Sequence, residues 1–340
     1  MLYIDYSAKQ TFEFCAWAWY ERYVNKRQAR RREGQRDDAL TLGSLVHAGL
    51  EDWYRRRVCP EISPEAIAKF DPTPECLGEA KRLLEAYTIY YPNDPYKVLL
   101  LEKPLSFDLF PWCRVVAKVD TAVEVEQGMR VPGGLNEEGL ELEPGIYSLE
   151  HKTKDAEIDR GMYMASWQTN MQADFQMLVM QAKFPERPIR GVIVNVLEKP
   201  RPYVPKRTCK NCKIVLEMAA FIATSEGHCC PMCGVEQKLS VSKGPRVERK
   251  YECWRFLVTR TSERLERSLN EIRGTATTMS GMISMGMDTA SPNRSNCCIP
   301  RFKKKCEYFT PHLYNVSTES SDFEDTEDYV GEGMVGWQDD

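Results

Sequence analysis

Apolar and polar residues alternate along the chain with two periods, one typical of helices and one typical of strands. Spacing of three and four predicts five helices, over residues 8–31, 41–57, 75–90, 160–183 and 254–285. Alternation with a period of two, or a continuous apolar run, predicts strands over 97–107, 112–126, 145–153 and 191–197. The order of these elements predicts an α/β fold with a central mixed β-sheet flanked by helices.

The same pattern divides the chain into four parts. A core over 1–205 is followed by a small cysteine-bearing insert over 206–250. Residues 251–316 contain a C-terminal helix and a second cysteine-bearing segment, and we expect both to complete the core. Residues 317–340 form an acidic tail without the apolar spacing of a packed element, so we expect this tail to be disordered.

The composition is that of a globular protein, since 42% of the 340 residues are hydrophobic and 28% are charged. These values exclude collagen-like, mucin-like and wholly disordered classes. No apolar run approaches the roughly 18–20 residues that span a bilayer, and no secretory signal is visible, so we expect no membrane association. We therefore expect a cytoplasmic protein, whose 13 cysteines are thiols or metal ligands rather than disulfides.

The net charge of −4 hides an uneven distribution. Residues 317–340 contain nine of the 50 acidic residues and no Lys or Arg, so residues 1–316 carry 46 basic against 41 acidic residues, a net charge of +5. A mildly basic body is compatible with a polyanionic partner but does not establish one.

A basic run ends the first expected helix, and aromatic residues precede it. The pattern indicates either a surface that stacks bases and neutralises phosphates, or a packed aromatic face with a solvated basic end. The basic residues are Arg27, Arg30, Arg31 and Arg32.

Three polar side chains interrupt the apolar pattern of the expected strands. Asp120 lies within one strand, and Glu150 and Lys152 lie two residues apart in the next, so the last two project from one face. A carboxylate beside an ammonium suits metal-assisted hydrolysis: carboxylates bind Mg²⁺ or Mn²⁺, and the lysine stabilises an attacking hydroxide near a phosphate. His47 follows Gly43 by one helical turn, and the missing side chain at Gly43 would let this helix approach the sheet until His47 reaches the metal.

Each of these features is ambiguous by itself. A Glu-x-Lys triplet more often lies on a solvated strand face, and a lone helical histidine is more often a surface or capped core residue. An aspartate in a strand often marks a turn or an edge. The order of the whole set along the chain is more informative than any of its members.

The ordered set Gly43-x3-His47, Asp120 and Glu150-x-Lys152, followed by a helix that carries glutamine, resembles the RecB-like branch of the PD-(D/E)XK nuclease superfamily. That branch includes AddB-type nucleases, CRISPR-adaptation nucleases and phage recombination exonucleases. The resemblance covers most of the chain outside the insert and the tail, and it implies a core like that of restriction endonucleases.

The resemblance also implies a role for each matching residue. His47, Asp120 and Glu150 would bind Mg²⁺ or Mn²⁺ together with the backbone carbonyl of His151, and Lys152 would be the catalytic lysine.

A glutamine in the following helix completes the family pattern. Gln176 would act with the catalytic residues and position the substrate or the lysine. The family usually has a tyrosine four residues after this glutamine, whereas Met180 stands there in this chain. Gln172, which has Gln176 four residues after it, is the alternative.

The function implied by the resemblance is metal-dependent hydrolysis of DNA. The interpretation that we prefer is an exonuclease that acts on single strands or DNA ends. Its setting would be recombination, repair or phage DNA processing. The setting would be a bacterial or phage-infected cytosol or nucleoid. Two alternatives stay open: a CRISPR spacer-processing nuclease with a partner integrase, and a non-catalytic DNA-binding or assembly protein that uses the fold as a scaffold. The intact Asp, Glu and Lys set argues against the scaffold.

Four cysteines of the insert have the spacing of a zinc site. Cys209-x2-Cys212 and Cys230-x2-Cys233 are two pairs separated by 17 residues, the arrangement of a four-thiolate zinc ribbon. Cys229 could replace Cys230, but only Cys230 makes a C-x-x-C pair with Cys233. An insert of this size cannot build a large core, so bound Zn²⁺ would stabilise its fold. Its role could be structural, or it could contact DNA or a protein.

A second set of potential ligands comes from the two ends of the core. Several RecB-like nucleases hold an iron–sulfur cluster through one N-terminal and three C-terminal cysteines, and this chain has a comparable set with a histidine in the last place. A [4Fe–4S] cluster, a zinc site and a site without metal all stay open. The residues are Cys15, Cys297, Cys298, Cys306 and His312.

The acidic tail over 317–340 has two interpretations. It is either a solubilising terminus or an interaction tail. As an interaction tail, it would dock on a replication or recombination protein or compete with DNA for the basic body.

Overall fold

The computed structural model describes residues 1–29, 38–133, 139–155, 159–200, 206–213, 215–217, 222–223, 228–237, 250–286 and 323–325. The helices of these residues are α1 (Tyr6–Phe14), α2 (Ala16–Trp19), α3 (Asp38–Arg56), α4 (Pro64–Phe70), α5 (Pro74–Tyr90), α6 (Arg160–Thr169), α7 (Met171–Lys183) and α8 (Ser262–Met285), with a π-helical turn η1 (Tyr20–Val24). No helix of this described part is long and apolar enough to cross a membrane.

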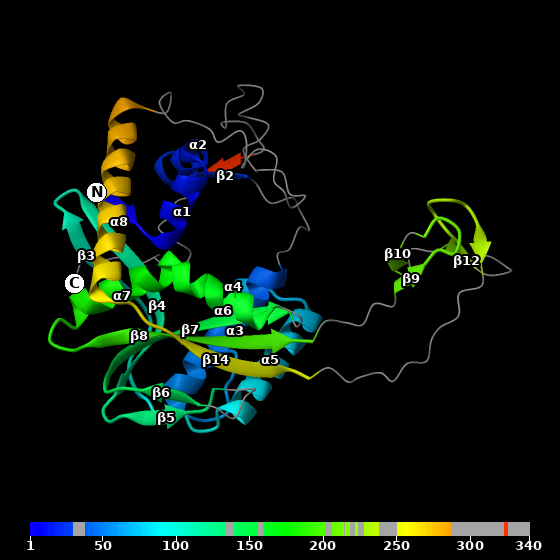
Figure 1. The fold of residues 1–340 in the computed structure, drawn as a ribbon, viewed down its shortest axis with the longest axis horizontal. Helices are drawn as coiled ribbons and strands as arrows, with labels where there is room; N and C mark the ends of the chain where they lie inside the picture. The colour runs from blue at the N-terminus through cyan, green and yellow to red at the C-terminus, as the bar shows by residue number, and fades with distance from the viewer. Residues whose placement is uncertain are drawn as a thin grey trace.

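A mixed six-stranded sheet forms the centre of the fold (Figure 1). Its strands are β1 (Leu2–Ile4), β3 (Lys97–Phe110), β4 (Cys113–Val125), β7 (Gly145–Asp155), β8 (Ile189–Lys199) and β14 (Glu252–Val258). The order is β1-β4-β7-β8-β14, and β3 also pairs with β4. β7 and β8 run parallel because α6 and α7 connect them, as a parallel pair requires a crossover. The expected α/β fold with a mixed central sheet is confirmed.

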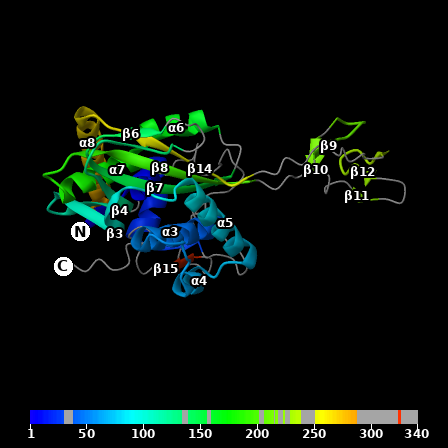
Figure 2. The same cartoon turned by 90° about the horizontal axis from the view of Figure 1, so that it is seen from below.

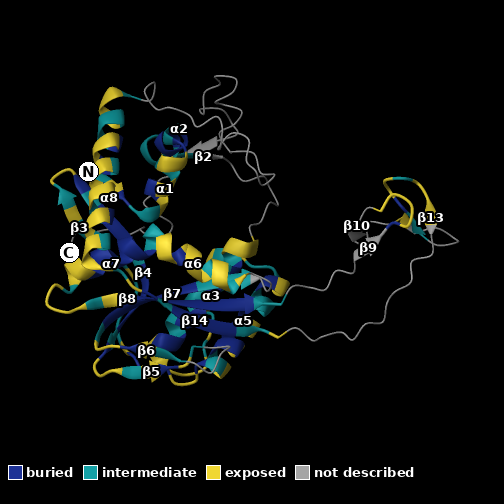
Figure 3. Ribbon diagram, viewed as in Figure 1, coloured by how far each residue is buried: buried dark blue, intermediate teal, exposed yellow. Residues whose placement is uncertain are grey.

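Helices cover both faces of this sheet. Figure 2 shows α3 and α5 on one side and α6 and α8 on the other. Leu45, Leu50 and Leu83 of α3 and α5 pack with Tyr147 and Leu149 of β7 in one apolar cluster. The opposite face is covered by further clusters, to which α1, α7 and α8 contribute. The central strands are therefore buried, whereas α8 keeps an exposed outer surface (Figure 3).

The first expected helix, 8–31, is in fact several elements. Cys15 has an extended backbone conformation, with φ −160° and ψ 105°, and it separates α1 from α2. Its Sγ accepts a hydrogen bond from the backbone N–H of Ala18 at 3.5 Å, so Cys15 caps the second helix. The chain then continues through η1 into β2 (Arg27–Ala29), so Arg27 lies on a strand and not on a helix.

Two further helix predictions are corrected. Asn170 ends α6 with an extended backbone, and its side chain accepts a hydrogen bond from Gln172 N, so the expected helix 160–183 is two helices. The expected helix 254–285 begins as a strand, because Trp254, Phe256 and Val258 are buried where β14 pairs with β8. Local spacing does not reveal this distant pairing.

Short strand pairs complete the described elements. β5 (Met129–Val131) pairs antiparallel with β6 (Leu140–Leu142), between β4 and β7 along the chain. β9 (Lys206–Thr208) pairs with β10 (Val215–Glu217), and β11 (Ile222–Ala223), β12 (His228–Cys229) and β13 (Glu236–Gln237) form a small sheet of their own. In the acidic tail, β15 (Phe323–Asp325) pairs antiparallel with β2, so these three residues differ from the expected disorder.

Candidate active site

Asp120 lies where β4 and β7 separate. The ladder between these strands ends at the pair Thr121–Leu149, directly before Asp120. Beyond this pair the backbone N–H of His151 donates to Oδ2 of Asp120 at 3.0 Å. Asp120 is only 7% exposed, so the neighbouring strand fixes its carboxylate in a buried position.

Glu150 and Lys152 project from the same face of β7, as their spacing predicts. Nζ of Lys152 lies 2.5 Å from Oε1 of Glu150. Gln172 of α7 donates to the same Oε1 at 2.7 Å, and Gln176 donates to Oε2. Ser148 in turn donates to Oε1 of Gln176 at 3.0 Å. Both glutamines considered from the sequence thus meet the Glu150 carboxylate, which is held by three donors.

His47 of α3 lies at the point where β4 and β7 separate. Its Nδ1 lies 3.4 Å from Oε1 of Glu102 and 3.5 Å from Oδ2 of Asp120, and its Nε2 lies 3.1 Å from the carbonyl oxygen of His151. Ligand atoms of His47, Glu102 and Asp120 all lie within 4.8 Å of one another. An imidazole Nδ1 beside two carboxylates is a donor set that suits Mg²⁺ or Mn²⁺, whereas the His151 carbonyl faces the other ring nitrogen. Glu150 lies beside this group rather than within it.

Glu102 is the member of this group that the sequence pattern did not indicate. It lies on β3, in the part of the strand that runs beside Asp120, and Nζ of Lys118 is 2.5 Å from its Oε2. Its φ of +46° is a left-handed conformation that a non-glycine residue rarely adopts in a strand. The sequence signal that could have indicated Glu102 is the one that indicated Asp120, a carboxylate within an apolar strand.

The close packing of these groups changes their pKa values. Burial lowers the pKa of His47, but the charge of Asp120 and the hydrogen bond to Glu102 outweigh this effect and raise it to about 9. Burial and the charge of Glu150 raise the pKa of Asp120 to about 7. Burial would also raise the pKa of Glu102, yet its contacts with His47 and Lys118 lower it. The site therefore holds protons that a metal ion would displace.

Lys152 and His151 have opposite protonation behaviour. Burial lowers the pKa of Lys152, but Glu150 outweighs this and raises it above its ordinary value, so the ammonium stays charged. Burial lowers the pKa of His151 far below its ordinary value, so its imidazole stays neutral. The metal-binding atom expected from His151 is its carbonyl oxygen, and this oxygen needs no ionisation.

The His151 imidazole faces away from Glu150, into a buried polar network. Asn195 of β8 lies 3.2 Å from its Nδ1 and 3.4 Å from the hydroxyl of Tyr87. Tyr87 accepts a hydrogen bond from Arg255 of β14 at 2.7 Å, and Arg255 forms a fully buried ion pair with Asp94. This network connects β7 to β8, β14 and α5.

A second buried carboxylate fixes the helix that carries the two glutamines. Asp174 of α7 accepts hydrogen bonds from Arg260 and Ser268, the latter at 2.6 Å. Arg260 also donates to the backbone oxygens of Trp167 and Asn170, which lie at the junction of α6 and α7. These contacts hold α7 in the position from which its glutamines reach Glu150.

The glycine before His47 has a smaller effect than expected. A Cβ at Gly43 would lie 3.8 Å from Oγ1 of Thr153, which is an ordinary contact. The approach of α3 to β7 would therefore also accept alanine.

The four insert cysteines predicted as zinc ligands come together. Sγ of Cys209 lies 3.6 Å from Sγ of Cys233, and Sγ of Cys212 lies 3.8 Å from Sγ of Cys230. Tetrahedral Zn–S bonds of about 2.3 Å would place two sulfurs about 3.8 Å apart, so the spacing fits zinc. The Cys229 thiol instead donates to the carbonyl of Gly234 at 3.1 Å.

Two similar turns present these thiols. Gly234 follows the second pair with φ +70°, and Lys213 follows the first with φ +59°. Both conformations let backbone N–H groups point at the sulfurs. The N–H of Cys212 lowers the pKa of Cys209 to about 6, and the N–H of Val235 lowers the pKa of Cys233. Thiolates are the form that binds zinc.

Two further groups of predicted residues lie wholly or partly outside the described residues. Cys15 is buried and caps α2, as described above. The remaining cluster residues and most of the basic run lie outside the described residues: Cys297, Cys298, Cys306, His312, Arg30, Arg31 and Arg32.

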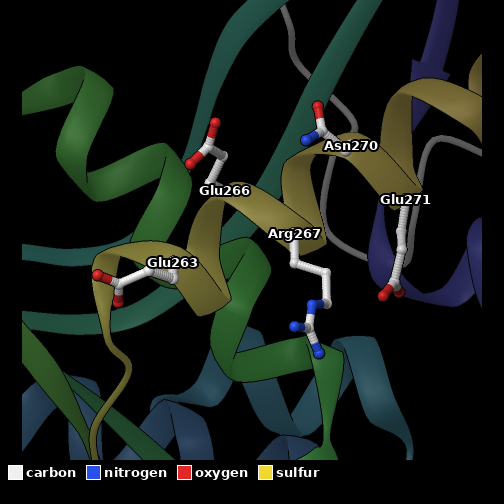
Figure 4. Close-up of a pocket in the computed structure, with 5 residues that line it drawn as sticks. All are labelled: Glu263, Glu266, Arg267, Asn270 and Glu271. Carbon is white, nitrogen blue, oxygen red and sulfur yellow. The ribbon is translucent and has the colours of Figure 1, made fainter.

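A separate surface hollow lies on α8 (Figure 4). Among the described residues, side chains of that helix line it: Glu263, Glu266, Arg267, Asn270 and Glu271. None of them belongs to the two groups described above.

Comparison with a family model bears on the first site, around His47, Glu102 and Asp120. Residues 5–131 match the model of the PD-(D/E)XK nuclease superfamily. This segment contains His47, Glu102 and Asp120, and it ends before Glu150 and Lys152. The match is therefore a similarity to that superfamily over the part of the chain that carries the first half of the site, and it does not depend on the Glu-x-Lys triplet.

Two other comparisons add less. No curated protein matches the chain. The crystal structure of a "Putative exonuclease" from Eubacterium rectale is similar, with 10% sequence identity, a TM-score of 0.44, and coverage of 87% of this chain and 86% of that one. At these values the function has to be argued from the geometry of this chain.

Proposed function

We propose that this protein is a nuclease of the PD-(D/E)XK type that hydrolyses DNA with Mg²⁺ or Mn²⁺. The observation that carries the proposal is the convergence of His47, Glu102 and Asp120 on one point, beside the Glu150–Lys152 pair. The family match over residues 5–131 supports the nuclease class. A preference for single strands or DNA ends, in recombination, repair or phage DNA processing, rests on the RecB-like resemblance.

The residues of the site divide the work of hydrolysis. His47, Glu102 and Asp120 would hold the divalent ion. Glu150 and the carbonyl of His151, which the resemblance adds to the ligands, lie beside this group. The bound ion would polarise the phosphodiester and lower the pKa of a water molecule. Lys152, charged and 30% exposed at its side chain, stabilises the negative charge that develops on the phosphate. Gln172 and Gln176 keep the Glu150 carboxylate oriented.

The four-cysteine group is proposed as a structural zinc site. Its sulfur spacing and its lowered thiol pKa values support this assignment. Two-residue and three-residue strands surround it, so the described part of the insert offers little apolar burial of its own.

Digestion of single-stranded DNA tests the proposal. Linear end-labelled and circular single strands of equal length are incubated with wild-type protein and Mg²⁺ or Mn²⁺. An exonuclease degrades the linear substrate and leaves the circle intact, while the label gives the polarity. Cleavage of both the linear and the circular strand would agree with a nuclease but contradict the preference for ends. Cleavage of neither, under either metal, rejects the proposed function.

A further inference from the structure

A polar groove lies between α1 and the junction of α6 and α7. Its volume is about 340 Å³, within the size range of small-ligand sites. The residues that line it are Tyr6, Lys9, Gln10, Glu13, Ser166, Thr169, Asn170 and Met171. Apart from Asn170, which helps to hold α7, none of them has been assigned a role in the site described above.

The groove lies next to the catalytic lysine. Nζ of Lys152 lies 5.8 Å from the centroid of the Trp167 ring on α6, and Ser166 and Thr169 of that helix line the groove. Across the groove, burial raises the pKa of the Tyr6 hydroxyl and the Lys152 ammonium opposes this rise. Gln10 also donates to the Tyr6 hydroxyl at 3.1 Å. A DNA strand whose phosphodiester lies at Lys152 therefore has this groove beside it.

Lys9 is the cation of the groove, and its environment is unusual for lysine. Its side chain is only 3% exposed, and its charge is paired with Glu13 one turn later on α1. A buried charge needs a counter-ion, and Glu13 supplies it in this structure.

Glu13 is a weak choice for that counter-ion. Its side chain is 54% exposed, and it lies in the last turn of α1, where the helix dipole disfavours negative charge. The order Lys then Glu at a spacing of four is also the less favourable one for a helical ion pair. Another anion could therefore displace Glu13 from Lys9 at little cost.

We propose that the groove binds a backbone phosphate of the DNA substrate, next to the phosphodiester at Lys152, with Lys9 as its counter-ion. In the free protein Glu13 occupies the place of that phosphate. The inference rests on the proposed function, because the occupant is the strand that the site would cleave. Lys9 thereby binds substrate, and Glu13 weakens its binding.

Two substitutions with opposite expected effects test the groove. Binding of a labelled single-stranded oligonucleotide is followed by fluorescence anisotropy in the full chain with Lys152→Ala, which keeps the DNA uncut. Lys9→Ala should weaken binding about fivefold at 0.1 M salt and reduce the slope of log K against log salt by about 0.7, the value for one single-strand phosphate contact. Glu13→Gln should tighten binding by a similar factor.

Matched charge changes on the opposite face of the sheet provide the controls. Lys81→Ala and Glu85→Gln alter exposed residues of α5 and should leave affinity unchanged. Glu13 is exposed, so Glu13→Gln keeps the test valid even if Lys9→Ala lowers stability.

The outcomes separate the two proposals. If the Lys152→Ala chain binds the oligonucleotide while Lys9→Ala and Glu13→Gln behave like the controls, the groove inference is overturned and the nuclease stands. If the chain binds no DNA under any salt condition, the proposed function is overturned and the groove inference falls with it.

Discussion

Nε2 of His47 lies 3.1 Å from the carbonyl oxygen of His151, although the two residues are 104 positions apart in the chain. This contact brings α3 against β7 at the point where β4 and β7 separate. The same imidazole faces Glu102 and Asp120 through Nδ1. Donors from one helix and three strands thus meet around a single histidine.

Glu102 should contribute to metal affinity. Glu102→Gln removes a carboxylate from the group of three, so we expect the affinity for Mn²⁺ to fall roughly tenfold, as for removal of a supporting ligand. Isothermal titration calorimetry measures this directly, with Glu126→Gln, at an exposed carboxylate of β4–β5, as the control. Unchanged affinity would mean that Glu102 serves only as the partner of Lys118.

Metal binding should release protons. With a pKa of about 9, His47 is protonated near neutral pH, and Asp120, with a pKa of about 7, is protonated in part; these protons must leave for the two residues to bind a metal. The apparent affinity should therefore rise as the pH increases through these two values and fall as it decreases. Titration in two buffers of different ionisation enthalpy counts the released protons. A binding enthalpy independent of the buffer would contradict the assignment of these ligands.

The buried ion pair behind the catalytic strand should be essential for stability. Asp94→Asn leaves the Arg255 charge buried without its counter-ion, and loss of one partner of such a pair costs about 3–5 kcal/mol. Urea unfolding measures the change in the free energy of unfolding. The control Asp108→Asn affects an exposed pair with Arg114 and should cost about 0–1 kcal/mol. Equal effects of the two substitutions would contradict this account.

The insert should bind one zinc ion through four specific cysteines. Cys212→Ser removes one member of the sulfur group, so we expect it to lose zinc, whereas Cys229→Ser changes a thiol outside the group and should retain it. Elemental analysis of the purified variants gives the zinc content per chain. Loss of zinc in Cys229→Ser, with retention in Cys212→Ser, would mean that Cys229 and not Cys212 binds the zinc ion.

Local spacing accounts for the parts of the site that sequence patterns predicted. Glu150 and Lys152 share a face because strand side chains alternate, and the two C-x-x-C pairs converge because each forms its own tight turn. Glu102 escaped prediction because its contact with His47 depends on a left-handed backbone conformation and on the pairing of β3 with β4. These are tertiary properties, which periodicity does not encode.

The same limit explains the errors in the helices. Apolar residues occupy positions 253, 254 and 256–258, so helical and strand spacing overlap there, and pairing with β8 decides the outcome. The break at Cys15 depends on a thiol that caps α2, a role that a cysteine rarely has.

The central claim is that Lys152 acts in metal-dependent hydrolysis of DNA. The most direct test compares kcat for digestion of end-labelled single-stranded DNA by the wild type, Lys152→Ala and Lys154→Ala, at saturating substrate and Mg²⁺ or Mn²⁺. Lys154 lies two residues further along β7 and provides an equal change in charge. We predict that Lys152→Ala lowers kcat by roughly 100- to 1,000-fold, as removal of a group that stabilises the transition state does. Lys154→Ala should keep kcat near that of the wild type, and equal kcat values for all three proteins would contradict the account.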